Sequence, residues 1–243
     1  MSRLPALVEL HGVSKSFGSL KAIEDVSLVV AEGEALGIVG PNGAGKTTLL
    51  NVIAGSLRPD RGSVIFEGRD ITRLAGNEHC RVGIARTFQI PRPFAGLTAF
   101  ENVLVGAIHG RGKADGNVQQ ACVEALERAR LLGKANALAG QLTLLERKRL
   151  ELARALATRP RVLLLDEIGG GLTEPEVLEL VATIKELRAA GISIVWIEHI
   201  VHAVVSVVDR LVALAAGRKL IEGDPRVVLE SPELRDVYLG ADL

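Results

Sequence analysis

Apolar residues recur along this chain in two patterns, and each pattern predicts a different kind of element. Short runs that are almost entirely apolar predict strands buried on both faces. The clearest such runs are residues 34–40, 161–167 and 192–199. Stretches with apolar residues three and four positions apart, such as 98–110 and 118–132, predict helices. Because strands of this kind alternate with helices, the pattern predicts a parallel sheet covered on both faces.

The remaining elements follow the same two patterns and complete the predicted fold. Further strands are expected at 7–13, 24–30, 63–68 and 210–217, and further helices at 47–55, 142–156, 174–191 and 200–208. Residues 109–117, rich in glycine and charge, are expected to form a surface connection. We predict one α/β domain, with a core over 1–90 and 158–243 and an inserted helical lobe over about 91–157.

Composition narrows the class of protein. The 243 residues are 48% hydrophobic, which is ample for a core, and 29 basic residues balance 29 acidic ones. This balance gives no reason to expect nucleic acid or an anionic membrane surface as the main partner. Residues 1–10 lack the features of a signal peptide, and the longest apolar stretch, 200–217, is interrupted by Asp209 and Arg210. We expect a cytosolic protein in which Cys80 and Cys122 are reduced thiols.

The strongest chemical signal is GPNGAGKT, which matches the phosphate-binding pattern GxxxxGK[ST] and lies between a predicted strand and a predicted helix. Glycines let successive backbone N–H groups face phosphate oxygens, and the helix start adds partial positive charge. We expect Lys46 to neutralise the β- and γ-phosphates and the Thr47 hydroxyl to ligate Mg²⁺. The predicted nucleotide contacts in this segment are Gly40, Pro41, Asn42, Gly43, Ala44, Gly45, Lys46, Thr47 and Thr48.

The run VLLLDE supplies a second half for such a site. Its apolar residues predict a buried strand, and α/β sheets bind ligands at the carboxyl ends of their strands. Asp166 is therefore expected to hold the magnesium shell, and Glu167 to orient or deprotonate the attacking water.

With these two motifs, the chain resembles the nucleotide-binding subunits of ABC transporters over nearly its whole length. The resemblance implies that Phe17 in SKSFG stacks on adenine, that Gln89 in ARTFQ touches Mg²⁺ and relays to the membrane subunit, and that His199 in IVWIEH contacts the γ-phosphate. It also implies a P-loop NTPase (RecA-like) core with an N-terminal antiparallel β region, and ATP with Mg²⁺ as ligands. The predicted catalytic residues are Glu167, His199 and Gln89, and the predicted metal ligands are Thr47, Gln89 and Asp166.

The segment LTLLE lies where that family carries its LSGGQ signature, which reaches ATP on the opposite subunit. The residues expected to fill this role in modified form are Leu142, Thr143, Leu144, Leu145 and Glu146. Thr143 and Glu146 have the spacing of a capping box, and helical spacing predicts that Leu145 packs inward. Leu144 adds bulk where glycine would allow close approach of the backbone. The basic run 147–149 is expected to form a solvated outer face.

The loop after VLLLDE departs from the family pattern. Ile168 stands where the family usually has proline, and Thr173 where it usually has Asp or Asn. The triple glycine 169–171 keeps this loop adaptable. These changes bear on signalling between two ATP sites.

Among ABC ATPases, the chain is similar to those of branched-chain (hydrophobic) amino acid importers in ARTFQ, FENVLVGA, IEH and the ending DVYLG. The resemblance implies an ATP-hydrolysing subunit on the inner face of the cell membrane that powers import of amino acids or related small amides. Its implied partners are membrane-spanning permease subunits, a second ABC ATPase subunit of the same or a different kind, and, indirectly, a periplasmic binding protein. No nucleic acid is expected.

Three other functions compete with this interpretation. A lipopolysaccharide-export ATPase shares the ending DVYLG. A non-transport ABC ATPase acting on nucleic acid usually carries a coiled coil or a second cassette, and neither pattern is found here. A regulatory nucleotide switch without turnover is disfavoured by Glu167 and His199.

We also expect Phe94, in IPRPFAGLT, to dock a short cytoplasmic helix of the membrane subunit; the alternative is that Phe94 belongs to the core of the lobe.

Overall fold

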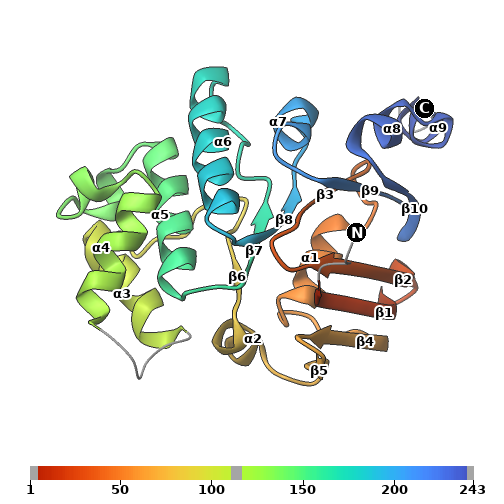
Figure 1. Ribbon diagram of the computed structural model, residues 1–243, viewed down its shortest axis with the longest axis horizontal. Helices are drawn as coiled ribbons and strands as arrows, with labels where there is room; N and C mark the ends of the chain where they lie inside the picture. Colours follow the sequence, from red (N-terminus) through yellow and green to blue (C-terminus); the bar gives the residue numbers. More distant parts are fainter. Residues whose placement is uncertain (1–4, 111–116, 240–243) are drawn as a thin grey trace. The chain divides into compact units, whose positions relative to one another are not determined.

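The computed structural model of the protein describes residues 5–110 and 117–239 and divides into two compact units (Figure 1). Unit 1 comprises residues 1–76 and 193–243, and unit 2 comprises residues 77–192. Most of the predicted surface connection 109–117 and the final glycine of DVYLG lie outside the described residues.

Unit 1 contains an antiparallel sheet built from the N-terminal part of the chain. Its strand order is β2 (Leu20–Ala31), β1 (Ala6–Phe17), β4 (Arg61–Phe66) and β5 (Arg69–Asp70). Buried and exposed residues alternate along the second half of β2, so one face of the sheet meets the core. The expected N-terminal antiparallel region is confirmed, with strands longer than the apolar runs that predicted them.

A second group of strands in unit 1 has mostly parallel pairing. Its order is β10 (Arg218–Gly223), β9 (Arg210–Ala215), β3 (Ala35–Val39) and β8 (Ser193–Ile197). Strand β3 is parallel to both β8 and β9, and every residue of β3 and β8 is buried, as their apolar runs predict. Strand β10 was not predicted, because it is half exposed and charged, and it pairs antiparallel to β9.

The helices of unit 1 are α1 (Lys46–Ile53), α7 (Val201–Val205), α8 (Pro225–Glu230) and α9 (Pro232–Leu239). The glycine-rich segment connects β3 to α1, and α1 begins at Lys46. Helices α8 and α9 lie beside β10 (Figure 1). They were not predicted, since each is too short for a clear helical period. Asp224 caps α8 by accepting a hydrogen bond from the Arg226 amide, 2.9 Å away.

Unit 2 contains one parallel strand pair, β6 (Ile84–Arg86) with β7 (Val162–Asp166). Its helices are α2 (Gly76–Val82), α3 (Ala99–His109), α4 (Val118–Arg128), α5 (Leu144–Ala157) and α6 (Glu174–Ala189), with short 3₁₀ turns at Leu132–Lys134 and Ala139–Gln141. Helices α3, α4 and α5 pack on one another (Figure 1). The predicted helix 118–132 ends early, because Arg130 adopts a left-handed φ of 54°.

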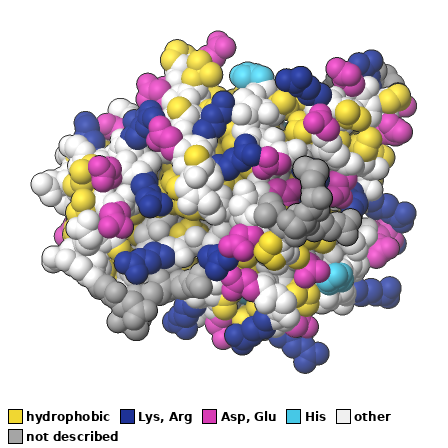
Figure 2. Space-filling view, in the orientation of Figure 1, with side chains coloured by type: hydrophobic (Ala, Val, Ile, Leu, Met, Phe, Trp, Pro, Cys, Tyr) yellow, Lys and Arg dark blue, Asp and Glu magenta, His cyan; other side chains and the backbone are white. Residues whose placement is uncertain are grey.

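Neither sign of charge dominates the face of the molecule shown in Figure 2. Acidic and basic side chains are interspersed over the face shown in Figure 2, as their equal numbers lead one to expect. Within the described ranges, no helix is both long enough and apolar enough to cross a bilayer.

Candidate functional site

The segment GPNGAGKT forms a tight loop between β3 and α1 in unit 1. Gly43 and Gly45 have φ angles of 80° and 96°, where side chains other than glycine are strained. A Cβ on Gly45 would lie 2.3 Å from the carbonyl oxygen of Ala22, and one on Gly40 would lie 2.1 Å from that of Leu214. Backbone conformation therefore requires glycine at Gly43, and close contact with neighbouring strands adds a second reason at Gly40 and Gly45.

The side chains of this loop are arranged around its own carbonyl groups. Lys46 is buried, and its ammonium donates hydrogen bonds to the carbonyls of Gly40 (2.7 Å) and Pro41 (2.9 Å). Ala44 is buried, whereas Asn42 and Thr47 are exposed and Thr48 is half-buried. The loop thus holds a cation at its centre and keeps the Thr47 hydroxyl accessible.

Phe17 and His199 both lie exposed in unit 1. Phe17 ends β1 and pairs with Leu20, two residues before the Ala22 carbonyl that contacts Gly45. The aromatic ring is therefore on the hairpin that touches the glycine-rich loop. The Lys15 ammonium lies over the ring, 5.9 Å from its centroid. His199 follows β8, and its backbone amide donates to the Glu198 carboxylate at 3.0 Å.

In unit 2, the two carboxylates at the end of β7 are buried and have different partners. The Arg86 guanidinium lies 2.6 Å from Oδ2 of Asp166. The side-chain amide of Gln89 donates a hydrogen bond of 2.5 Å from Nε2 to Oε2 of Glu167. Glu167 has a left-handed φ of 46°, which is rare for a residue with a long side chain. The structure thus brings Gln89 and Glu167 together, two residues predicted to act on the same reaction.

Two residues near this site, Lys148 and Arg86, were missed by the sequence analysis. Lys148 is only 4% exposed, and its ammonium donates to the carbonyls of Gln89 (3.2 Å) and Glu167 (3.5 Å). The signal for Lys148 was its spacing, three residues after Leu145 and so on the inward stripe of α5. The signal for Arg86 was its position at the end of a short apolar segment.

The expectation of a solvated basic face at 147–149 was wrong. Lys148 points inward, and Arg149 lies 2.6 Å from Glu179, with its side chain mostly covered. Arg147 donates to the carbonyls of Leu142 (2.8 Å) and Gly140 (3.1 Å), just before α5 begins. These cations are held by carbonyl and carboxylate oxygens because the end of the preceding turn and α6 pack beside this face.

The LTLLE segment forms the start of α5, and its predicted capping box is confirmed. The Glu146 amide donates to Oγ1 of Thr143 at 3.3 Å, and the Thr143 amide donates to the Glu146 carboxylate at 2.9 Å. Leu142 and Leu145 are buried, as predicted for Leu145, whereas Leu144 is 42% exposed. The hydrogen bond from the Thr143 amide, together with the Lys134 ammonium 3.2 Å away, lowers the pKa of Glu146 below its ordinary value of 4.5.

That pKa shift has a definite consequence for stability. A carboxyl whose pKa is lower in the folded chain stabilises the fold fully above its ordinary pKa of 4.5. The stabilisation is lost as the pH falls through the lowered value. The start of α5 is therefore most stable near neutral pH. There the Glu146 carboxylate is ionised and interacts with the helix N-terminus and with Lys134.

The loop between β7 and α6 is made of turns. The Gly170 amide donates to the Glu167 carbonyl at 3.2 Å, and the Leu172 amide donates to the Gly169 carbonyl at 3.2 Å. Gly171 has a φ of 78°, and Ile168 is buried. Thr173 precedes α6, and its amide and hydroxyl both donate to the Glu176 carboxylate at 2.8 Å. The threonine thus supports the start of this helix.

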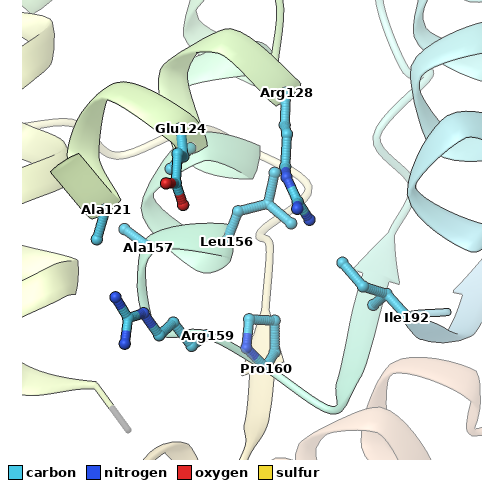
Figure 3. Close-up of a pocket in the computed structure, with 9 residues that line it drawn as sticks. Ala121, Glu124, Arg128, Leu156, Ala157, Arg159, Pro160 and Ile192 are labelled. Carbon is cyan, nitrogen blue, oxygen red and sulfur yellow. The ribbon is translucent and has the colours of Figure 1, made fainter. Parts of the chain in front are cut away.

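A cavity in unit 2 lies away from the predicted chemistry. It has a volume of about 290 Å³ and lies beside α4, the end of α5 and the connection to β7 (Figure 3). The side chains around it include Arg128, Leu156, Arg159 and Ile192. None of the residues predicted to bind nucleotide or metal lines this cavity.

Comparison with known proteins gives the same class of protein. Residues 23–169 match the ABC transporter family. The chain is 35% identical to the high-affinity branched-chain amino acid transport ATP-binding protein BraF of Pseudomonas aeruginosa, over 96% of this chain and 98% of that protein. It is 36% identical to the lipopolysaccharide export system ATP-binding protein LptB of Acidithiobacillus ferridurans, over 96% of this chain and 97% of that protein.

Solved structures agree with the sequence comparisons. The ADP conformation of an ATP-binding cassette of an ABC transporter superposes with a TM-score of 0.88 at 32% identity, over 97% of this chain and 99% of that chain. A nucleotide-free cassette of an ABC transporter also gives a TM-score of 0.88 at 32% identity, over 96% and 99% of the two chains. The P-loop, the strand-end carboxylates and these full-length similarities lead to one conclusion: the chain belongs to the ABC transporter family and is an ATPase subunit of such a transporter.

Proposed function

We propose that this ATPase powers the import of branched-chain amino acids or related small amides. The observation that carries this proposal is the similarity over 96% of the chain to BraF, which is named for branched-chain amino acid transport. The LivG protein of Salmonella typhimurium, named for the same transport, is 36% identical over the same share of the chain. ARTFQ, FENVLVGA and IEH are the segments in which this likeness was expected.

The residues of the loop support the binding of ATP. Lys46 would exchange the carbonyls of Gly40 and Pro41 for phosphate oxygens, which hold its charge more strongly. The amides at the start of α1 lack partners within the helix and would donate to the same phosphates. The exposed ring of Phe17, on the hairpin that touches the loop, would stack on adenine. The other residues of the segment 40–48 would also contact the nucleotide.

The oxygen atoms available to Mg²⁺ fit that ion. We propose the Thr47 hydroxyl, the Gln89 side chain and Asp166 as its ligands, because Mg²⁺ prefers hydroxyl, carbonyl and carboxylate oxygens. Arg86 engages Oδ2 of Asp166, so Oδ1 is the atom proposed to serve the metal. The ion, when bound, neutralises charge that develops on the phosphates during transfer.

We propose that Glu167 orients and deprotonates the attacking water. Its carboxylate is buried and already hydrogen-bonded to Gln89 through Oε2, which supports a fixed orientation. His199 would donate to the γ-phosphate, and Leu142, Thr143, Leu144, Leu145 and Glu146 would face the nucleotide of a second ATPase subunit. The backbone amides of a capped helix start remain donors whatever side chains they carry, so the leucines of LTLLE need not abolish this contact.

The partners follow from the same proposal. Permease subunits would span the membrane, a second ABC ATPase subunit of the same or a different kind would complete the dimer, and a periplasmic binding protein would deliver the substrate to the permease. The chain itself would lie on the cytoplasmic side, peripheral to the membrane. Nucleic acid has no place in this function.

A second candidate is lipopolysaccharide export, which the 36% identity to LptB supports. Reconstitution with the membrane subunits of its own transporter distinguishes the two functions. We expect MgATP-driven uptake of leucine or a related amino acid into vesicles when the binding protein is supplied. Extraction of lipopolysaccharide without amino acid uptake would replace the import proposal by the export one.

A second experiment tests the contact with the permease. Phe94 is 47% exposed, so the alternative that it belongs to the lobe core is wrong. The loop that carries it is held by Asn102, which is buried, accepts from the Phe94 amide (2.8 Å) and donates to the Phe94 carbonyl (3.1 Å). The Arg154 guanidinium lies 5.2 Å from the ring centroid. An exposed aromatic ring on a segment held in this way, which also exposes Ile90, suits a partner helix.

We therefore expect a photo-crosslinker at position 94 to capture a permease subunit in the intact transporter. Leu178 on α6 is also an exposed apolar residue, so position 178 serves as the control and should capture much less permease. Equal yields from the two positions, or none from position 94, would contradict docking at Phe94.

A further inference from the structure

The first turns of α5 contact the segment that follows β7 at both of its ends. Leu144 and Lys148 are four residues apart, so they share one face of the helix. The Lys148 ammonium reaches the carbonyl of Glu167 at 3.5 Å and that of Gln89 at 3.2 Å. Leu144 lies at the other end, where a Cβ on Gly171 would be 3.1 Å from its Cδ2 atom. One helix face thus bounds residues 167–171.

This segment needs support from outside itself. Glu167 and Gly171 both have left-handed φ angles, 46° and 78°, with two glycines between Ile168 and Gly171. Glycine-rich backbone has many accessible conformations, and a left-handed glutamate persists only when its surroundings hold it. The hydrogen bond from the Gly170 amide to the Glu167 carbonyl is a local restraint, and its 3.2 Å length is that of an ordinary hydrogen bond.

The ammonium of Lys148 adds a charged restraint in a buried place. Its two carbonyl acceptors belong to Gln89 and Glu167, the residues whose side chains are joined by a hydrogen bond of 2.5 Å. Lys148 therefore ties the backbones of a pair whose side chains already meet. A hydrogen bond from a charged donor is stronger than a neutral one, and burial strengthens it further.

We propose that Leu144 and Lys148 are positioning residues, which together hold the Glu167 carboxylate in its working orientation within the same subunit. This inference rests on the proposed role of Glu167 in hydrolysis. In this proposal Leu144 packs on Gly171 and restricts the conformation of the glycine-rich loop. A glycine at position 144 could not do this, because it has no side chain. The leucine would act on this chain's own glutamate in addition to any contact with a nucleotide on the opposite subunit.

The first test measures steady-state ATP hydrolysis in the assembled transporter with Lys148→Met and Leu144→Ala. We expect kcat to fall about 10- to 100-fold for Lys148→Met, with the KM for ATP within about threefold of the parent, since a displacement near 1 Å costs roughly 10²-fold in rate. Leu144→Ala should lose kcat in the same way but to a smaller extent. Leu178→Ala, an exposed leucine on α6, is the matched control and should keep the parent kcat.

A double-mutant cycle separates this role from contact with the opposite nucleotide. Gly171→Ala strains the backbone in either background, but only beside Leu144 does its methyl group also meet a side chain. We expect Gly171→Ala to lower kcat several-fold more in the Leu144 background than in the Leu144→Ala background. Additive effects would show that Leu144 does not act through the loop and would overturn its role.

The remaining outcomes are distinct. Turnover in the parent, with an unchanged kcat in Lys148→Met and Leu144→Ala, would overturn the inference and leave the proposed function standing. A parent complex without MgATP hydrolysis would overturn the proposed function and the inference with it. A lowered melting temperature with unchanged kcat would assign both residues a purely structural role, which also overturns the inference.

Discussion

Glu167→Gln is expected to bind MgATP yet to lose most of its turnover. Glutamine keeps the length of the side chain, fits the same left-handed backbone and can still meet the Gln89 amide through its carbonyl oxygen. It cannot accept a proton from water. Loss of a positioned general base typically lowers the rate by about 10²- to 10⁴-fold. The measurement is ATP hydrolysis in the assembled complex, beside equilibrium binding of MgATP to the same variant.

The control for this variant is Glu101→Gln. Glu101 forms the capping box of α3 with Thr98, and glutamine serves in such a box, so the substitution repeats the chemical change away from the site. We expect parent-like turnover from it. Near-normal hydrolysis by Glu167→Gln would remove Glu167 from the mechanism, and loss of MgATP binding would show that the substitution damages more than proton transfer.

Gly45→Ala is expected to weaken MgATP binding strongly. The new Cβ would lie 2.3 Å from the Ala22 carbonyl oxygen and 2.9 Å from Cγ2 of Ile23, so the loop or β2 must shift. A φ of 96° adds strain of roughly 1–2 kcal/mol, and overpacking costs about 1–3 kcal/mol more. A displacement of the phosphate-binding amides by about 1 Å should lower affinity by at least roughly 10²-fold. Nucleotide titration and thermal unfolding measure the two effects.

Gly33→Ala is the matched control for that experiment. Gly33 also has a left-handed φ, 74°, but a Cβ there meets no atom within 4 Å. We expect backbone strain in Gly33→Ala to lower the free energy of unfolding by only roughly 1–2 kcal/mol. The variant should bind MgATP as the parent does. If the two variants bind MgATP equally, contact with Ala22 is not what demands glycine at position 45.

The parts of the molecule that could be predicted from sequence are those with a strong local rule. Wholly apolar runs identified β3, β7 and β8, because strands covered on both faces admit few polar residues. The glycine pattern identified the loop at 40–47, and threonine with glutamate three residues later identified the start of α5. In each case the residues that define the element are neighbours in the chain.

The parts that could not be predicted depend on residues far apart in the chain. Lys148 looked like one of three solvated cations, because its acceptors, the carbonyls of Gln89 and Glu167, come from distant segments. The pairing of Arg86 with Asp166 joins β6 to β7 in the same way. Strand β6 has only three residues, too few for any period to be recognised, and it exists because β7 pairs with it.

The contact between Leu144 and Gly171 also predicts a pattern of inheritance among related chains. The φ of 78° at Gly171 already favours glycine there, and a bulky residue at position 144 adds a close contact to that restriction. A glycine at position 144 would remove the contact but not the backbone restriction. We therefore expect the two positions to vary together in an alignment of relatives: glycine at the position of residue 171 should be nearly invariant where leucine or another large residue stands at 144. Where the ordinary signature glycine is found at 144, residues that tolerate a left-handed φ, such as asparagine, should replace the glycine at 171 more often. The departure from the family signature at position 144 would then be recognisable in sequence data by the accompanying glycine at position 171.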